Sequence, residues 1–241
     1  MRADRDLQVQ IAWACRILAM AGHEDLILGH VSACRPGSDI IYMKRFGLGL
    51  GEITPDDVLM IDRDARKLGG RGDVHLEAAM HTEVYRVRPD VGAVIHTHAP
   101  YTTAFGATSA RFEFLSHDAV LFPDGLASFD ETAELITSGE QGQAVARALG
   151  NRRAVLLRNH GVLVVGKSVP WAVLTALTLE RAVQIQAIAI SLGALQPMPI
   201  ELVKRLHPYK YRDDFTDSYW HYLIRQVRRA GWDTGMPSEE T

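Results

Sequence analysis

Two apolar runs that carry histidines constrain this chain more than any other feature of its sequence. The first, Ala93–Tyr101, begins Ala-Val-Ile after the breaker Arg88-Pro89-Asp90 and then places His96 and His98 one residue apart. An apolar run of this kind predicts a buried β-strand. Residues two apart on an extended chain point to the same face, so both imidazoles can aim at one point, as a metal centre requires. Taken alone, a His-x-His pair fits a metal ligand set and a polar surface or core pair equally well.

The second run, Ala154–Gly166, is apolar on both sides of His160 and Gly161. We expect another buried strand, so that two strands together deliver three histidines, with the carboxylate of Glu77 available beside them. Three histidines with an optional carboxylate suit zinc or another divalent transition metal that keeps one position open for substrate.

Glu77 also has a plainer interpretation. It falls in or just after the first turn of a helix that we expect over residues 75–85, with Asp73 as its N-cap. A carboxylate at that place is stabilised by the helix dipole. Spacing alone therefore favours a structural role for Glu77.

The remaining pattern predicts an α/β protein. Further helices are expected over residues 7–21, 138–149, 168–192 and 215–230, and one more starting at Pro100. Strands are expected over residues 26–34, 40–43 and 58–61, as a small antiparallel sheet in the first third of the chain. Residues 44–51 are expected to form a glycine-rich loop. No linker or internal repeat is recognisable, so we expect a single domain over residues 1–241.

Charge, cysteine content and hydropathy argue against several classes of protein. The net charge is −3, so we expect no nucleic-acid partner. The two cysteines, Cys15 and Cys34, do not make a disulfide framework. No signal peptide or membrane-spanning run is recognisable, so we expect a cytoplasmic protein with no membrane partner. The basic residues that gather between positions 204 and 229 predict a solvated or subunit-facing surface.

Three motifs occur in order along the chain. They are Glu77…His81…Tyr85-x-x-Arg88-Pro89-Asp90, then Ala93-Val94-x-His96-x-His98-Ala99, and far downstream Leu156-Leu157-x-Asn159-His160-Gly161. With these motifs, residues 7–193 resemble the class II aldolase/adducin family. That family includes sugar-phosphate aldolases, an epimerase, a dehydratase, decarboxylases of hydroxy or oxo acids, and the non-catalytic adducin head.

The resemblance implies a three-layer α/β/α sandwich around a mostly antiparallel central sheet, and a homotetramer with active sites at subunit interfaces. It implies that His96, His98 and His160 ligate the metal. It also implies that Glu77 ligates the metal while the site is empty of substrate and acts as general acid or base once substrate binds. Zinc is the metal implied first, with manganese, iron or cobalt as alternatives.

The chain departs from the phosphate-using aldolases in three places. Gly29-His30-Val31-Ser32 stands where they have Gly-Asn-Val-Ser, Phe46-Gly47 where they have Thr-Gly, and His75-Leu76 where they have Ser-Ser. A dianionic phosphate needs several aligned donors, and Phe46 and Leu76 supply none. We therefore expect a small-molecule substrate without a phosphate. His30 and His75, helped by Lys44 or Arg45, would hold a carboxylate, and Phe46 and Leu76 would flank a ring or an apolar chain.

These observations predict a metal-dependent carbon–carbon lyase, with decarboxylation of an unphosphorylated hydroxy or oxo acid slightly favoured over aldol cleavage. A substrate that chelates through two adjacent oxygens would let the ion stabilise the enolate left when the carbon–carbon bond breaks. Glu77 would protonate the carbanionic carbon or, in retro-aldol cleavage, accept the hydroxyl proton. An epimerase or dehydratase is the second enzymatic alternative. An adducin-like interaction module is the non-enzymatic one, which the complete ligand set disfavours.

Two further segments hold candidate substrate contacts. His117 lies in the triplet Ser116-His117-Asp118 and is explained equally well as a solvated loop histidine. The tail, residues 197–241, is expected to be helical and to lie at a subunit interface. In family aldolases, aromatic residues of this region close over a neighbouring site, which makes Tyr219 a candidate here.

Overall fold

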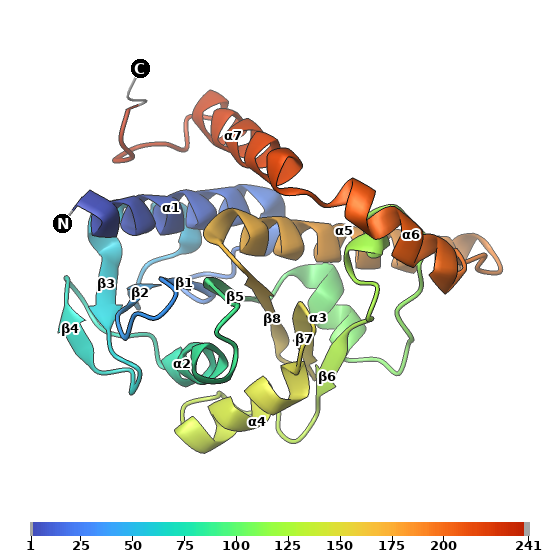
Figure 1. The fold of residues 1–241 in the computed structure, drawn as a ribbon, viewed down its shortest axis with the longest axis horizontal. Coiled ribbons are helices and arrows are strands. Elements are labelled where there is room, and N and C mark those ends of the chain that lie inside the picture. The colour runs from blue at the N-terminus through green and yellow to red at the C-terminus, as the bar shows by residue number, and fades with distance from the viewer. Residues whose placement is uncertain (1, 239–241) are drawn as a thin grey trace.

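The computed structural model describes residues 2–238, and its centre is an eight-stranded sheet in the order β4-β3-β2-β1-β5-β8-β7-β6 (Figure 1). All neighbouring strands are antiparallel except β6 and β7, which are parallel. The strands are β1 (His30–Cys34), β2 (Ile41–Lys44), β3 (Val58–Ile61), β4 (Lys67–Gly69), β5 (Ala93–Thr97), β6 (Ala127–Phe129), β7 (Ala154–Leu157) and β8 (Gly161–Gly166).

Helices cover both faces of this sheet, which confirms the predicted α/β/α sandwich. The helices are α1 (Arg2–Leu18), α2 (Ala78–Val87), α3 (Pro100–Gly106), α4 (Gly139–Leu149), α5 (Val169–Leu192), α6 (Ile200–Lys210) and α7 (Asp213–Arg229). Short helical turns span Ala19–His23, Leu50–Glu52, Pro55–Asp57 and Ala119–Leu121. Helices α1 and α5 lie on one face and α2 and α4 on the other, while α7 lies outside α1 and α5 (Figure 1).

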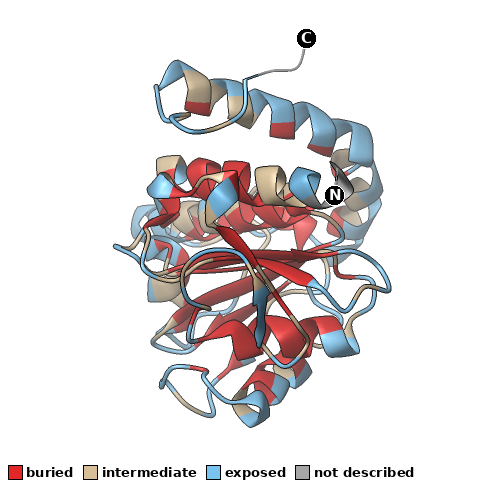
Figure 2. Cartoon of the chain, turned by 90° about the vertical axis from the view of Figure 1, so that its left-hand side faces the viewer, coloured by how far each residue is buried: buried red, intermediate tan, exposed pale blue. Residues whose placement is uncertain are grey.

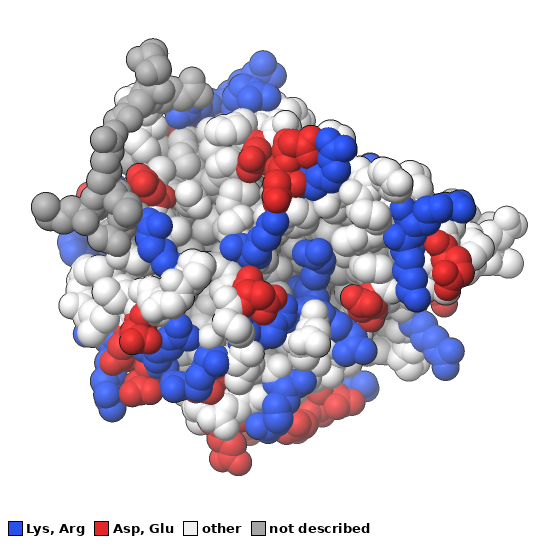
Figure 3. All heavy atoms as spheres, in the orientation of Figure 1, with Lys and Arg blue, Asp and Glu red and all other residues white. Residues whose placement is uncertain are grey.

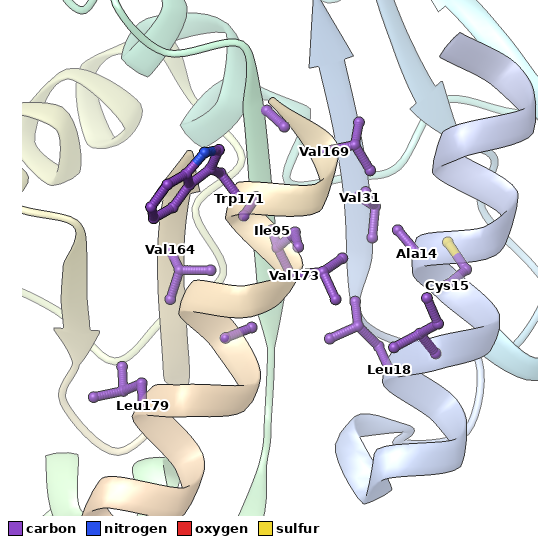
Figure 4. Close-up of a cluster of buried hydrophobic side chains, with 14 of the residues drawn as sticks. Ala14, Cys15, Leu18, Val31, Ile95, Val164, Val169, Trp171, Val173 and Leu179 are labelled. Carbon is purple, nitrogen blue, oxygen red and sulfur yellow. The ribbon is translucent and has the colours of Figure 1, made fainter. Parts of the chain in front are cut away.

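Strand residues alternate between two hydrophobic cores because side chains of a strand point to opposite faces in turn. Ile95 of β5 and Val31 of β1 pack with α1 and α5 (Figure 4), whereas Val94 packs in the core under α2 and α4. By the same period of two, His96 of β5 and His30 of β1 face α2. The alternation therefore gathers the polar residues of both strands beneath one helix.

Helix α5 is the described helix whose length and apolar composition would allow it to cross a membrane by those two criteria alone. Here it packs against α1, α3 and α7 and against strands β5 and β8. Its first half is buried, with Trp171 and Val173 in the core (Figure 4). Its last turn exposes Ile188, Ile190 and Leu192.

The tail is helical, as expected, and forms α6 and α7. Val203, Trp220 and Val227 insert into the core, while most of α7 is exposed (Figure 2). Acidic and basic side chains are interspersed on the face drawn in Figure 3 rather than separated by sign. The position of the tail at a subunit interface stays a prediction.

The run over residues 154–166 is two antiparallel strands and not one interrupted strand. Residues 158–160 form the turn between β7 and β8, and Asn159 takes a φ of 58°, a left-handed conformation that asparagine tolerates. Position 161 requires glycine, because a Cβ there would lie 2.6 Å from the His98 ring and 2.7 Å from the Thr97 carbonyl oxygen. The turn thus brings His160 back beside the end of β5.

Three other expectations need correction. The helix expected from residue 75 begins at Ala78 with Glu77 in the N-cap position, so the capping role predicted for Asp73 is wrong. The strand expected from residue 26 begins at His30, because Leu28 donates to the Asp25 carbonyl and closes a turn. The small sheet expected in the first third is part of the single eight-stranded sheet. Strands β4 and β6 carry no clear pattern in the sequence, and within the helical tail the sequence gives no separate bounds for α6.

Close packing of α2 on α4 holds the start of α2 in place and yields a stability prediction. A Cβ at Gly142 of α4 would lie 2.6 Å from the backbone oxygen of Ala79 in α2. We expect Gly142→Ala to lower the free energy of unfolding by about 1–3 kcal/mol, because the helices must separate. Urea denaturation measures this, with Gly139→Ala as control, since its Cβ would meet nothing nearer than 4.0 Å. Equal stability of the two variants would contradict the prediction.

Candidate metal centre

Strand β5 and the residue pair after it deliver two histidines whose ring nitrogens face each other. His96 is fully buried in β5, and His98 follows the strand with its side chain 15% exposed. Their Nε2 atoms are 3.1 Å apart. The period of two along the extended chain produces this convergence, as the sequence predicts.

The partners of the other ring nitrogens decide which tautomer each histidine has. His96 Nδ1 lies 3.1 Å from the carbonyl oxygen of Val162, which can only accept a hydrogen. His98 Nδ1 lies 2.9 Å from a carboxylate oxygen of Asp25, which accepts as well. In its neutral form each ring therefore carries its hydrogen on Nδ1, and two bare Nε2 lone pairs then face each other. Such an arrangement is repulsive without a cation between the nitrogens.

His160 adds a third nitrogen from the turn before β8. Its Nε2 is buried and has no hydrogen-bond partner among the described residues. One ring nitrogen from each of His96, His98 and His160 lies within 4.8 Å of the others. Ligand nitrogens around a tetrahedral zinc are about 3.3 Å apart, given Zn–N distances of about 2.0–2.1 Å. The donor set fits a divalent transition metal with a position left open.

Glu77 lies at the start of α2 with its carboxylate among these histidines. Oε1 accepts a hydrogen bond of 2.9 Å from the Ile136 backbone and lies 3.5 Å from His160 Nε2. Oε2 lies 3.8 Å from His96 Nε2 and 3.6 Å from His30 Nε2. Burial acts to raise the pKa of Glu77, but the nearby imidazoles of His160 and His30 outweigh it and hold the pKa below the usual range. The carboxylate is therefore shared between the three histidines and a second group.

That second group contains His30 and His75, which form another compact donor set with Glu77. Their rings are 3.9 Å apart, and the Nε2 atom of each is buried with no hydrogen-bond partner among the described residues. The Glu77 amide points at His75 Nδ1 at 3.5 Å, which leaves the His75 hydrogen on Nε2. Burial lowers the pKa of His75 to about 4, with Lys44 adding to the effect, so this ring is neutral near pH 7.

The predicted apolar contacts lie beside His75. Phe46 meets the His75 ring edge-on, with ring centroids 5.4 Å apart. Gly47 is exposed with a φ of 88°, and Leu76 is 57% exposed. Of the residues that the sequence marks as substrate contacts, His30 and His75 thus lie together at Glu77, and Phe46 lies against His75.

Other candidates lie apart from this cluster within the chain. His117 is exposed, and its carbonyl accepts from the Tyr211 hydroxyl, near the end of β8 opposite to His160. Tyr219 is on α7, outside the helical layer that covers the other face of the sheet. Lys44 is buried and donates to the Ile27 carbonyl, and Arg45 lies against Asp57.

The sequence pattern does not single out the residues that support the cluster. Asp25 reaches His98 from a turn 73 positions away, so no local spacing reveals the contact. Ser32, His81 and Tyr85 form a buried hydrogen-bonded line that ends on His30. The spacing of four between Glu77, His81 and Tyr85 on one helix face was the available signal for the helical members.

Removal of the Asp25 carboxylate should weaken the metal site. We expect Asp25→Ala to lower zinc affinity about 10–100-fold, because His98 loses the acceptor that fixes its tautomer and ring orientation. Competition with a chelator of known affinity measures the change. Asp39→Ala removes an exposed carboxylate elsewhere and should bind zinc as the wild type does. Equal affinity of the two variants would show that Asp25 does not support the site.

The chain is similar to known proteins in both sequence and fold. The profile of the family described as Class II Aldolase and Adducin N-terminal domain matches residues 9–187. A 3,4-dihydroxyphthalate decarboxylase from Arthrobacter keyseri is 31% identical and covers 91% of this chain and 93% of its own length. A 4-hydroxy-3-prenylphenylpyruvate oxygenase/4-hydroxy-3-prenylbenzoate synthase from Streptomyces roseochromogenus subsp. oscitans is 30% identical, covering 82% of this chain and 73% of its own. The crystal structure of an aldolase II superfamily protein from Pseudomonas syringae superposes with a TM-score of 0.85 at 27% identity, over 95% of both chains. The protein therefore belongs to the class II aldolase and adducin family.

Proposed function

We propose that the protein is a metal-dependent carbon–carbon lyase that decarboxylates an unphosphorylated hydroxy or oxo acid, with aromatic acids the first class to test. The observation that carries the metal-dependent part is the pair of bare Nε2 lone pairs of His96 and His98, 3.1 Å apart. Two bare lone pairs at this distance repel each other, and a metal ion held by both nitrogens removes that repulsion.

His96, His98 and His160 would hold the ion, with Glu77 as the neighbouring carboxylate. Zinc is the first candidate, and manganese, iron and cobalt suit the same donors. When bound, the ion supplies Lewis-acid stabilisation of the negative charge that develops on substrate oxygens as the carbon–carbon bond breaks.

The neutral rings of His30 and His75 provide two buried nitrogens that face this centre and have no hydrogen-bond partner among residues 2–238. A buried N–H group is costly to leave unpaired, so an acceptor supplied by the substrate stabilises the complex. A carboxylate offers two such acceptor oxygens. Phe46 and Leu76 then flank the remainder of the substrate with apolar surface, which suits a ring.

Glu77 is the acid–base group within reach of both donor sets. Its Oε1 is held by the Ile136 amide, which leaves Oε2 of the resting carboxylate free to take up a proton from a substrate hydroxyl group and pass it to the carbon that loses carbon dioxide. Removal of carbon dioxide leaves one carbanionic carbon, and a single proton from this oxygen completes the reaction.

Decarboxylases among the relatives support the proposed reaction. A dihydroxyphthalate is an aromatic dicarboxylate with adjacent hydroxyl oxygens, and the relative that decarboxylates it aligns along almost the full chain. Aldol cleavage of an unphosphorylated hydroxy-ketone is the second candidate, because Glu77 is also placed to accept a hydroxyl proton. An epimerase or dehydratase uses related chemistry, and the complete histidine set disfavours a non-catalytic module.

We further propose a cytoplasmic homotetramer with its active sites at subunit interfaces. The exposed apolar residues Ile188, Ile190 and Leu192 at the end of α5 would be covered by such an assembly. His117 and Tyr219, which lie apart from the cluster in one chain, would contact substrate only if a neighbouring subunit brought them to its site.

Release of carbon dioxide tests the proposed reaction. We expect metal-loaded protein to release it from at least one member of a panel of catechol carboxylates, hydroxyphthalates and 2-oxo or 2-hydroxy acids. His96→Ala should abolish release, because the site loses a ligand, while His221→Ala, a change on the exposed surface of α7, should not. Aldehyde formation from unphosphorylated aldols without carbon dioxide would favour the aldolase. Efficient turnover of fuculose or ribulose phosphates would overturn the proposal.

His75 should act through its N–H group. We expect His75→Leu to raise KM for the carboxylate substrate about 10–150-fold, since a hydrogen bond to a charged group contributes about 1.5–3 kcal/mol. His75→Gln, which keeps an N–H donor, should retain most of the affinity. Zinc content, measured by metal analysis, should be unchanged in both. Loss of zinc in His75→Leu would show instead that this ring belongs to a metal site.

A further inference from the structure

A line of short hydrogen bonds runs beneath α2 and ends at the candidate site. The Tyr85 hydroxyl lies 2.8 Å from Ser32 Oγ, and Ser32 Oγ lies 2.6 Å from His81 Nδ1. The other nitrogen of His81, Nε2, lies 2.6 Å from His30 Nδ1. The line ends at His30 Nε2, which has no hydrogen-bond partner among the described residues and lies 3.6 Å from Glu77 Oε2.

Two regular periods build this line. His81 and Tyr85 are four and eight positions after Glu77, so all three share the face of α2 that meets the sheet. His30 and Ser32 are two apart in β1 and point to the same face of the sheet. The interface between α2 and β1 is therefore polar and continuous, although its four hydrogen-bonded residues are buried.

The hydrogens along this line of neutral groups can be arranged in two ways. In one, each hydrogen points towards the site: Tyr85 donates to Ser32, Ser32 to His81 Nδ1, and His81 Nε2–H to His30 Nδ1. His30 then carries its own hydrogen on Nε2. In the other, every hydrogen points away, and His30 Nε2 is bare. Burial lowers the pKa of His81 to about 3, so this ring is neutral in both.

The Tyr85 hydroxyl, at one end of the line, decides between the two arrangements of hydrogens. Ser32 Oγ is the only side-chain oxygen or nitrogen that the described residues place within hydrogen-bond distance of the Tyr85 hydroxyl. A buried O–H hydrogen without an acceptor is costly, so Tyr85 donates to Ser32. Ser32 has one hydrogen, which it then donates to the bare Nδ1 of His81. The remaining members follow, and the one hydrogen of the line without a close acceptor is that on His30 Nε2, which faces the Glu77 carboxylate at 3.6 Å.

We propose that Tyr85, Ser32 and His81 are positioning residues that hold His30 as its Nε2–H tautomer, with that hydrogen aimed at a substrate oxygen beside Glu77. The inference rests on the proposed function in one respect, that the group facing His30 is the substrate. It adds that the ligand must present an acceptor at this point, as an anionic carboxylate or phenolate oxygen does. It also assigns His30 to substrate and not to a second metal ion, because an Nε2–H nitrogen has no lone pair to offer.

The same line does not serve as a route for protons. Delivery of the His30 hydrogen to the substrate, with each member refilled from the next, would leave a phenolate on Tyr85. Burial raises the pKa of that hydroxyl well above its usual value, so the phenolate is unfavourable. The line therefore orients a donor, and the proton of the reaction is left to Glu77.

The tautomers of His30 and His81 test this assignment directly. In zinc-loaded full-length protein with 15N-labelled imidazoles, NMR distinguishes a nitrogen that carries hydrogen from a bare one. The His30 and His81 signals are identified by their loss in His30→Gln and His81→Gln. We expect hydrogen on Nε2 in both rings. A bare Nε2 on His30, or a second equivalent of zinc that disappears in His30→Gln, would overturn the proposal whether or not the protein releases carbon dioxide.

Binding of phthalate, used as a dicarboxylate probe, tests the consequence. Without the Ser32 hydroxyl, His81 can carry its hydrogen on either ring nitrogen. We therefore expect Ser32→Ala to convert part of the His30 population to the Nδ1–H form and to weaken phthalate binding about tenfold. Ser32→Thr keeps the hydroxyl and should restore both, and zinc content should not change. Tyr85→Phe removes the end of the line with its ring intact and should act in the direction of Ser32→Ala.

Each outcome separates the two proposals. Wild-type protein that shows the Nε2–H tautomer but binds no phthalate would keep the line and count against a carboxylate substrate. Unchanged tautomers and binding in Ser32→Ala and Tyr85→Phe would overturn the positioning role. If these variants instead lowered kcat with a changed solvent isotope effect and an unchanged KM, the line would be a proton route, contrary to the inference.

Discussion

The pairing of β1 with β5 in the middle of the sheet is the constraint on which the site depends. In this antiparallel register His30 lies directly opposite His96, and their rings are 4.9 Å apart. A shift of one residue would turn one of the two imidazoles to the α1 and α5 face, where the apolar core lies. The register thus fixes a donor for substrate and a ligand for metal side by side. Glu77, at the start of α2, lies across from both.

The same side chain, imidazole, has two chemical roles in this site. Where Nδ1 meets an acceptor, as His96 does at the Val162 carbonyl and His98 at Asp25, Nε2 is bare and suits a metal. Where Nδ1 is offered a hydrogen, as at His75 and, by inference, His30, Nε2 keeps its own and suits an anion. The partner of the far nitrogen decides which role each ring has. Neutral rings of both kinds can therefore be buried together without charge repulsion.

This division gives the departures from the phosphate-using aldolases a physical meaning. Imidazole N–H groups at His30 and His75 replace amide and hydroxyl donors, and Phe46 and Leu76 add apolar surface beside them. Fewer donors and more apolar contact suit a carboxylate on a ring better than a dianionic phosphate. The buried line behind His30 has a cost that substrate recognition would explain, since an apolar interface between α2 and β1 would be simpler to satisfy.

The regular spacing of residues along the sequence was enough to predict many of the strands and helices and the faces they present. The spacing of two in His96-x-His98 and the apolar alternation of β5 set the strand, its faces and the convergence of two rings. Ser138 and Ser168 marked the starts of α4 and α5. Only the tertiary structure decided the contacts that cross long separations: Asp25 behind His98, Ile136 on Glu77, and the turn at Asn159 that returns His160 to the site. Propensity and period act over a few residues, whereas register and tautomer depend on which distant atom faces each nitrogen, and that is settled only when the sheet and α2 pack together.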